Sequence, residues 1–115
     1  MAILQPYSGT ASISSTEYDL PSSTTVKSSI TNDGVYQLML DLTNMTATEQ
    51  YTLKIYEKTT STDTQKLVES VTFSGTQTEP LYVTPALLLL HGWTFTLQKN
   101  FGTDRSFTWS IRQAS

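Results

Sequence analysis

The chain of 115 residues has no cysteine, a single histidine and only five glycines, none of which neighbours another. Without cysteine the chain has no disulfide, no thiolate metal site and no cysteine nucleophile. One histidine, His91, is too few for a histidine metal site, and no G-x-S-x-G motif offers a serine for it to activate. Isolated glycines also exclude a glycine-rich phosphate-binding loop. We therefore expect a protein that is not an enzyme, with no metal, no cofactor and no small-molecule substrate.

Basic residues are also few, and they are not clustered. The seven lysines and arginines occur singly between Lys27 and Arg112, and the formal net charge is −3. Binding to nucleic acid depends on groups of basic side chains that neutralise phosphates, so we expect no nucleic-acid partner. The longest apolar run, residues 86–90, is far shorter than the roughly 20 residues of a membrane-spanning helix. The N-terminal residues lack the basic and apolar regions of a secretory signal, so no membrane partner is expected either.

Threonine, serine and aromatic residues, by contrast, are abundant. Thr and Ser make up about 30% of the sequence, and six Tyr, four Phe and two Trp are spread along it. Thr is β-branched and favours strands over helices, while the aromatic content argues against disorder. Short alternating segments recur about every 8 to 12 residues. These patterns predict an all-β protein with a single domain over residues 1–115, an antiparallel β-sandwich or jelly roll of about eight short strands.

The clearest alternation is near the C-terminus. Residues 93–98 and 107–112 each alternate apolar with polar side chains, and the break between them contains a glycine. This pattern predicts a β-hairpin with one buried face. The strongest core candidates are its apolar residues: Trp93, Phe95, Leu97, Phe107, Trp109 and Ile111.

A second hairpin is predicted between Tyr51 and Phe73, where two alternating segments flank the polar run TTSTDTQ. Pairing Lys58 with Lys66 would set Tyr51 opposite Phe73, so that apolar residues share one face. The Asp-Gly step at 33–34 predicts a third hairpin. Its second strand, residues 35–42, has apolar residues on both faces, so it should lie between two packed layers or at a subunit contact.

The other segments are expected to be short or irregular. Residues 10–14 and 16–20 suit edge strands, because Pro21 closes them, and residues 1–8 could form an extended arm ordered by a neighbour. Residues 42–50 break the alternation, and Thr46 with Glu49 has the spacing of a capping box. At most one short helical turn is predicted there.

The stretch VTPALLLLHG, residues 83–92, is the most apolar part of the chain. Pro85 cannot donate a backbone hydrogen bond, so the strand before it should end there. The leucines that follow fit either a short helix, capped by Thr84 and stopped by Gly92, or a buried strand over residues 86–90. In both cases successive leucines point in different directions. We expect part of this apolar surface to lie at a subunit contact.

Two weaker candidates for chemistry come from acidic and aromatic residues. Pairs of carboxylates can hydrolyse a glycosidic bond, and Glu57 with Glu69, or Glu17 with Asp19, would share a strand face. Charges that alternate along a strand usually form its solvated side, so neither pair predicts an enzyme. Some tyrosines fall outside the predicted core and could line a sugar-binding groove or a protein interface: Tyr7, Tyr18, Tyr56 and Tyr82.

Three segments carry a resemblance to a known group of proteins: DGVYQLMLDLTNMTATEQYTLKIYEK, TPALLLLHGWTFTLQK and GTDRSFTWSIR. Taken together, they resemble small proteins of tailed bacteriophages over nearly the whole chain from residue 8, with no catalytic or ligand motif. In phage virions, proteins of this size and composition include head decoration (cement) proteins, which are commonly β-sandwiches or jelly rolls. The resemblance implies a non-enzymatic structural protein on the capsid surface, made in the host cytoplasm, and mild acidity suits an outer surface.

This implied role predicts the partners and the contact residues. The partners are the major capsid protein and further copies of the chain, in a homo-oligomer such as a trimer. The alternatives are a phage tail or connector component and, from a different class, a carbohydrate-binding β-sandwich module. The residues expected at the subunit or capsid interface are Ile3, Leu4, Tyr7, Tyr82, Leu87, Leu88, Leu89 and Leu90.

Overall fold

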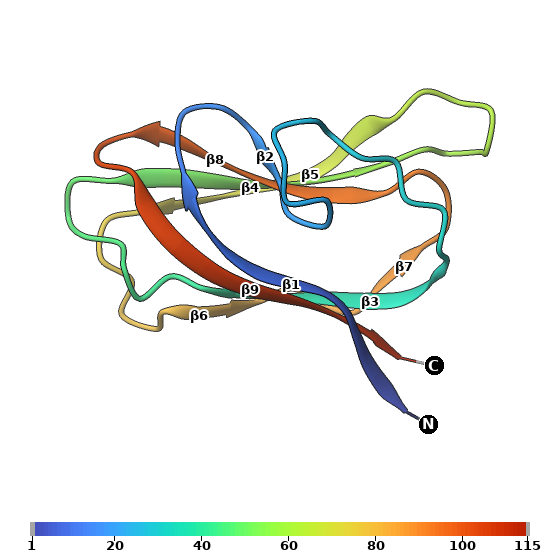
Figure 1. Cartoon of the computed structure of the whole chain (residues 1–115), viewed down its shortest axis with the longest axis horizontal. Helices are drawn as coiled ribbons and strands as arrows, with labels where there is room; N and C mark the ends of the chain where they lie inside the picture. Colours follow the sequence, from blue (N-terminus) through green and yellow to red (C-terminus); the bar gives the residue numbers. More distant parts are fainter. Residues whose placement is uncertain (1, 115) are drawn as a thin grey trace.

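A computed structural model describes residues 2–114, which form nine β-strands and no helix (Figure 1). The predicted all-β class is confirmed. No helix long and apolar enough to cross a membrane occurs in residues 2–114. In chain order the strands are β1 (Ile3–Ile13), β2 (Tyr18–Asp19), β3 (Gly34–Asp41), β4 (Gln50–Glu57), β5 (Lys66–Ser74), β6 (Leu81–Val83), β7 (Leu87–Leu89), β8 (Thr94–Phe101) and β9 (Arg105–Ala114).

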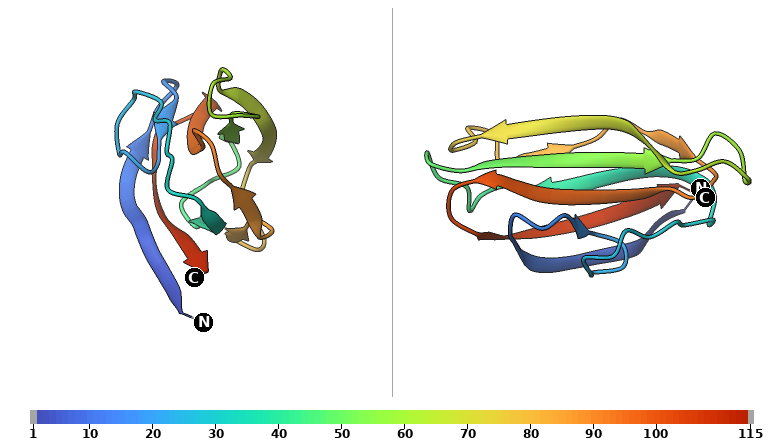
Figure 2. Two further views of the ribbon diagram at one scale, coloured as in Figure 1. Left: turned by 90° about the vertical axis from the view of Figure 1, so that its right-hand side faces the viewer. Right: turned by 90° about the horizontal axis from the view of Figure 1, so that it is seen from above.

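The strands form two antiparallel sheets that pack face to face (Figure 2). Sheet A has the order β1-β9-β3-β6, with β7 also paired to β3, and sheet B has the order β2-β8-β4-β5. Apart from the steps β4 to β5 and β6 to β7, each strand is followed by one in the opposite sheet. A double sheet with this crossing order is a jelly roll, the more specific of the two predicted forms.

Two of the three predicted hairpins are wrong. The residues of the C-terminal one form β8 and β9, but β8 lies in sheet B and β9 lies in sheet A. The Asp-Gly step also makes no hairpin, because Ile30 pairs with Trp93 in an isolated bridge and β3 begins at Gly34. Alternation shows which side chains face a core, but it does not select the neighbouring strand.

The β4–β5 hairpin is confirmed, and so is most of its register. The pairs predicted from Tyr51 to Ile55 are all present. A bulge after Ile55 then shifts the register by one, so that Glu57 rather than Lys58 lies opposite Lys66. Residues 66–70 of β5 are exposed, so no buried apolar set holds the register at this end.

Aromatic rings fill the centre of the core between the two sheets. The ring of Trp93 lies 4.4 Å from that of Tyr36 and 5.8 Å from that of Phe95, measured between centroids. Tyr51 and Phe107 meet edge to face at 4.7 Å, an arrangement that aromatic quadrupoles favour. The predicted core is confirmed, since all six candidates are buried: Trp93, Phe95, Leu97, Phe107, Trp109 and Ile111.

The two N-terminal strands lie at sheet edges, as predicted. β2 is an edge of sheet B, and β1 is an edge of sheet A with 11 residues rather than a short strand. Residues 3–8, considered above as an arm, form the first part of β1. Ile3 pairs with Ala114 and Leu4 with Gln113, and the register shifts between Leu4 and Tyr7, where Pro6 interrupts the donors.

The connection between β2 and β3 reaches the outer face of sheet B, where Lys27 lies over the Tyr56 ring and the Ser28 hydroxyl is hydrogen-bonded to that of Thr94. Thr94, on that face of β8, is therefore fully buried. The carboxylate of Asp19 is also buried and accepts five hydrogen bonds: one from the Thr94 hydroxyl, and two each from Ser22 and Ser28, through backbone N–H and hydroxyl. These bonds fix the covering segment to the sheet, because a buried carboxylate is stable only when it is fully hydrogen-bonded.

The leucine-rich stretch forms a strand, so the helical alternative is wrong, but the strand is neither as long nor as buried as the alternative over residues 86–90: β7 covers Leu87–Leu89, and Leu88 is exposed. β6 ends before Thr84, and β7 begins two residues after Pro85. Between them, the Thr84 hydroxyl accepts a hydrogen bond of 3.0 Å from the backbone N–H of Leu38 in β3. Gly92 has a φ of +55°, the left-handed conformation expected of a helix stop, but here it follows a strand.

A candidate association surface on sheet A

An apolar row crosses the outer face of sheet A near the chain ends. The register sets Leu88 of β7 opposite Val35 of β3, Val35 opposite Ala114 of β9, and Ala114 opposite Ile3 of β1. Directly opposite residues share a sheet face, so these four side chains, here called the apolar row, form one strip. Leu88 is 81% exposed and Ile3 is 63% exposed, while Val35 and Ala114 are half-buried. Neighbouring strands lie about 4.8 Å apart, so the row is about 14 Å long.

Strand alternation places the row on the outer face. Leu88 and Leu89 are consecutive in β7, and Leu89 is buried in the core, so Leu88 must point outward. The same reasoning holds for Val35 beside the buried Tyr36. In β9, Ile111 is buried, so Arg112 and Ala114 point to the outer face.

One hollow lies on each side of the row. A hollow of about 280 Å³ borders Ile3, Val35 and Ala114 and extends to Arg112. A second, of about 390 Å³, borders Val35 and Leu88 and extends to Asp33. The row is therefore flanked by room for apolar side chains of a partner.

A single charged group also lies on each side of the row. Gln37 lies two residues after Val35 in β3, and Arg112 of β9 is opposite Gln37. Asp33 lies two residues before Val35, in the other direction along the chain. The two charges are thus on opposite sides of the row. Within residues 2–114 neither the Arg112 guanidinium nor the Asp33 carboxylate has a hydrogen bond or an ion pair.

The structure brings together two of the residues predicted at an interface. Ile3 and Leu88, 85 positions apart in the sequence, both belong to the apolar row. Leu4 and Leu90, 48% and 50% exposed, lie outside it.

The remaining four predicted interface residues contact the core. Leu89 is buried, and Leu87 packs partly buried against the core. Tyr7 packs on Trp93, with ring centroids 5.9 Å apart, and Tyr82 packs edge to face on a core phenylalanine at 5.0 Å. The leucine run exceeded what one small core was expected to bury, and the two tyrosines fell outside the predicted core. The period of their strands nevertheless turns these side chains inward.

Sequence reasoning did not nominate the other members of this surface. For Val35 there was a signal, because apolar residues on both faces of residues 35–42 indicated an outer apolar side. For Ala114, Arg112 and Asp33 there was none. Their place depends on the pairing of β9 with β3, which the hairpin prediction missed.

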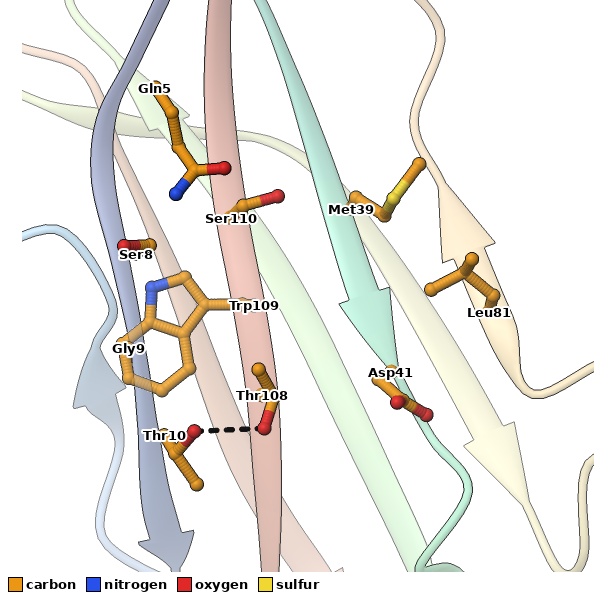
Figure 3. Close-up of a pocket in the computed structure, with 10 residues that line it drawn as sticks. All are labelled: Gln5, Ser8, Gly9, Thr10, Met39, Asp41, Leu81, Thr108, Trp109 and Ser110. Atoms are coloured by element: carbon orange, nitrogen blue, oxygen red, sulfur yellow. Dashed lines mark hydrogen bonds between the residues drawn. The ribbon is translucent and has the colours of Figure 1, made fainter.

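A second apolar group lies on the same face, toward the other end of the sheet (Figure 3). Met39 pairs with Val83, and Leu81 pairs with Asp41. Met39, Leu81 and Asp41 border a hollow of about 480 Å³. Figure 3 shows its other wall, made by polar side chains of β1 and β9: Ser8, Thr10, Thr108 and Ser110. Polar and apolar side chains both line this hollow, so the apolar row is the more uniform surface.

The candidates for chemistry lie among structural contacts, which for His91 are made by the backbone. His91 donates its backbone N–H to the Glu57 carboxylate at 3.3 Å, and its carbonyl accepts from Lys58 at 2.8 Å. Glu57 lies two residues after Ile55, the partner of Glu69, so the two glutamates share a face as predicted. The Glu57 carboxylate is, however, bound by the backbone, because it also accepts from the N–H of Leu90 at 2.8 Å. No group of three or more His, Asp or Glu residues that could hold a metal ion occurs in residues 2–114.

The outer face of sheet B also holds a buried tyrosine rather than an exposed one. The Tyr56 hydroxyl donates to the Glu17 carboxylate at 2.5 Å, and the Lys27 ammonium lies 3.9 Å from the ring centroid. Burial, with Glu17 as a further cause, raises the pKa of Tyr56 to about 12. The other tyrosines are buried or half-buried, so no tyrosine of the chain offers a fully exposed ring for stacking on a sugar.

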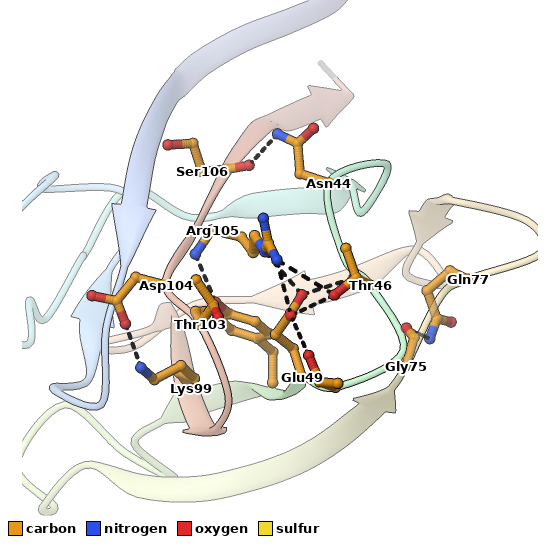
Figure 4. Close-up of polar contacts among 12 residues, drawn as sticks. Asn44, Thr46, Glu49, Gly75, Gln77, Lys99, Thr103, Asp104, Arg105 and Ser106 are labelled. Carbon is orange, nitrogen blue, oxygen red and sulfur yellow. Dashed lines mark hydrogen bonds and ion pairs between the residues drawn. The ribbon is translucent and has the colours of Figure 1, made fainter.

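A buried ion pair ties the start of β9 to the loop before β4 (Figure 4). The Arg105 guanidinium contacts Glu49 at 3.0 Å, and Thr46 donates to the same carboxylate through its backbone N–H and its hydroxyl, at 2.7 and 2.6 Å. Hydrogen bonds from Arg105, and then from Thr46, lower the pKa of Glu49 to about 2. Thr46 and Glu49 thus meet as their spacing predicted, but they close a turn and no helix follows.

Comparison with known proteins gives one distant structural likeness. No protein-family model matches the chain, and no curated protein matches it. Among solved structures, the chain is similar to the Eiger TNF from S. frugiperda, with a TM-score of 0.47 and 13% sequence identity. The match covers 95% of this chain and 86% of that chain. A likeness this low says nothing about function.

Proposed function

We propose that the chain is a non-enzymatic structural protein of a phage virion, a capsid decoration subunit that binds and stabilises the major capsid lattice. The observation that supports this role best is the apolar row on sheet A, an exposed strip held by four paired strands. Contiguous exposed apolar groups on a rigid surface mark sites of protein association. The phage origin rests on the sequence resemblance, and the location on the head rather than the tail is part of the proposal.

A decoration subunit stabilises a shell by binding its assembled form. Any ligand that binds one state preferentially shifts the equilibrium toward that state. The net charge of −3 suits the outside of a capsid, because packaged DNA would repel an acidic protein.

The test is co-sedimentation of the purified chain with assembled heads of a phage that encodes it. We expect binding by the wild type and a clear loss in the Leu88→Ser/Leu90→Ser variant, whose altered side chains are exposed. Leu67→Ser is the matched control, because Leu67 is 52% exposed on β5 of the other sheet. Thermal unfolding should be nearly the same for all three proteins.

Three outcomes would contradict the proposal. Binding to tails but not to heads would favour a tail or connector component. Retention on a glycan array without binding to virions would favour a carbohydrate-binding module. Unfolding of the double-serine variant would show that these leucines support the monomer.

A further inference from the structure

We infer that the apolar row binds the apolar row of a second copy of the chain, in a two-fold, face-to-face contact between two sheets A. The inference rests on the proposed function in one respect, that the row is an association surface. It commits that surface to a second copy, so that the dimer is the unit that binds the capsid lattice.

The reason is that the surface is self-complementary in charge. In a two-fold contact the same patch occurs on both partners, so each group must fit the image of its neighbours. The apolar residues satisfy this automatically, because they meet apolar residues. The charges meet this requirement only if groups of opposite sign lie on opposite sides of the rotation axis. Arg112 and Asp33 lie in this way, on opposite sides of the row.

The register sets the direction of the axis. Two residues of a strand span about 6.7 Å, which is the distance of Arg112 from the row on one side. Asp33, in the connection just before β3, borders the hollow on the other side. Rotation about an axis along the row exchanges these sides, and it brings Arg112 of each copy over Asp33 of the other. The two groups differ by one strand, about 4.8 Å, which the long arginine side chain can span.

The other in-plane axis fits less well. Rotation about an axis along the strands keeps each group on its own side of the row, so Arg112 would face Gln37 and Asp33 would face no cation. An unpaired charge at a contact loses hydration without compensation. The charges therefore select the axis along the row.

The shape of the face agrees with such a contact. The axis along the row sets Leu88 over Leu88 and Ile3 over Ile3 of the other copy, and these are its most exposed members, with side chains free to turn to either side. The hollows of about 280 and 390 Å³ on its two sides give the opposing side chains room to interleave. Sheets that pack face to face lie about 10 Å apart, which such interleaving fills.

The experiment is a charge-reversal cycle measured by sedimentation velocity over about a hundredfold range of concentration. The proteins are the wild type, Arg112→Asp, Asp33→Arg and the variant with both changes. Each single reversal should raise the dimer dissociation constant about tenfold or more, because it sets like charges opposite each other. The double variant restores the pairs with the signs exchanged, and its constant should return to within about threefold of the wild type.

Two controls separate the contact from general effects. Lys66→Asp changes the net charge equally, but Lys66 is exposed on β5 of sheet B, so its dimer should be unaffected. At protein concentrations below the dissociation constant, Arg112→Asp should leave the Tm unchanged, because Arg112 has no hydrogen-bond or ion-pair partner within residues 2–114.

A wild type that is monomeric throughout, or a double variant no better than the singles, would overturn the inference. Co-sedimentation with heads distinguishes this failure from failure of the proposed function. If a monomeric chain still binds heads through Leu88, the occupant of the row is the capsid protein and only the inference fails. If the chain dimerises as described but ignores virions, only the proposed function fails.

Discussion

Leu88 and Leu89 are neighbours in one strand, and we expect their truncation to alanine to have very different effects on stability. Leu89 is 4% exposed and packs in the core, whereas Leu88 is 81% exposed on the outer face. Truncating a buried leucine removes its transfer free energy and leaves a cavity, at a total of about 2 to 5 kcal/mol. β7 has three residues and a single partner strand, β3. Its surroundings can therefore relax, and the lower part of that range, about 2 to 3 kcal/mol, applies to Leu89→Ala.

Leu88→Ala should change the free energy of unfolding by less than about 0.5 kcal/mol, as is usual for exposed positions. The two variants share the same strand, the same side chain and the same change in β-propensity, so the difference isolates burial. For a domain of this size 1 kcal/mol corresponds to about 4 °C in Tm, so Leu89→Ala should melt about 10 °C lower.

Urea unfolding followed by tryptophan emission measures both effects, because Trp93 and Trp109 are both buried and report on the core. The protein concentration must stay below the dissociation constant of any dimer, since a dimer contact at Leu88 would make the free energy of unfolding depend on concentration. Equal losses in the two variants at low concentration would refute the reasoning, because they would show that β7 does not present these residues to opposite faces.

Three further predictions test other parts of the structure. The pKa of Glu49 is lowered from 4.5 to about 2, so the carboxylate adds stability that is present above pH 4.5 and is lost as the pH falls toward 2; Glu49→Gln should flatten this part of the stability profile, measured by urea unfolding at each pH. Gly102 has a φ of +98°, and an added Cβ would lie 2.5 Å from a backbone oxygen, whereas Gly75 has a φ of +72° with its nearest atoms at 3.8 Å. Gly102→Ala should therefore lower the free energy of unfolding by about 2 kcal/mol more than Gly75→Ala. Equal losses would contradict the close contact. Asp19→Ala leaves five hydrogen-bond donors without their acceptor. It should lower the free energy of unfolding by about 3 kcal/mol or more, with a smaller loss for Asp19→Asn. A loss below about 1 kcal/mol in calorimetry would show that the β2–β3 connection is held by other contacts.

Local patterns predicted the parts of the fold in which chain neighbours are also neighbours in space. The β4–β5 hairpin is the clearest case, because Tyr51 to Ile55 and their partners across a short loop carry matching alternation. The predicted register is wrong beyond Ile55, because residues 66–70 of β5 are exposed there and no buried side chains oppose a bulge.

The candidate site depended much more on the tertiary structure. The exposed ends of the row, Ile3 and Leu88, were nominated because large apolar residues gathered in short stretches. Their meeting in one row depends on Val35 and Ala114, through the chain of pairs from β7 to β1. No local pattern contains that chain of pairs.

The sequence by itself determined that the protein is all-β and that the apolar residues of its clearest alternating segments, 93–97 and 107–111, are buried, because period-two alternation and β-branched composition act residue by residue. Trp93, Phe95 and Phe107 needed no partner strand to be recognised as core. Only the tertiary structure decided that β8 and β9 belong to different sheets, and that four distant segments form the apolar row. The physical reason is that alternation fixes the face of a side chain, whereas strand order is chosen by the packing of all nine strands around one core.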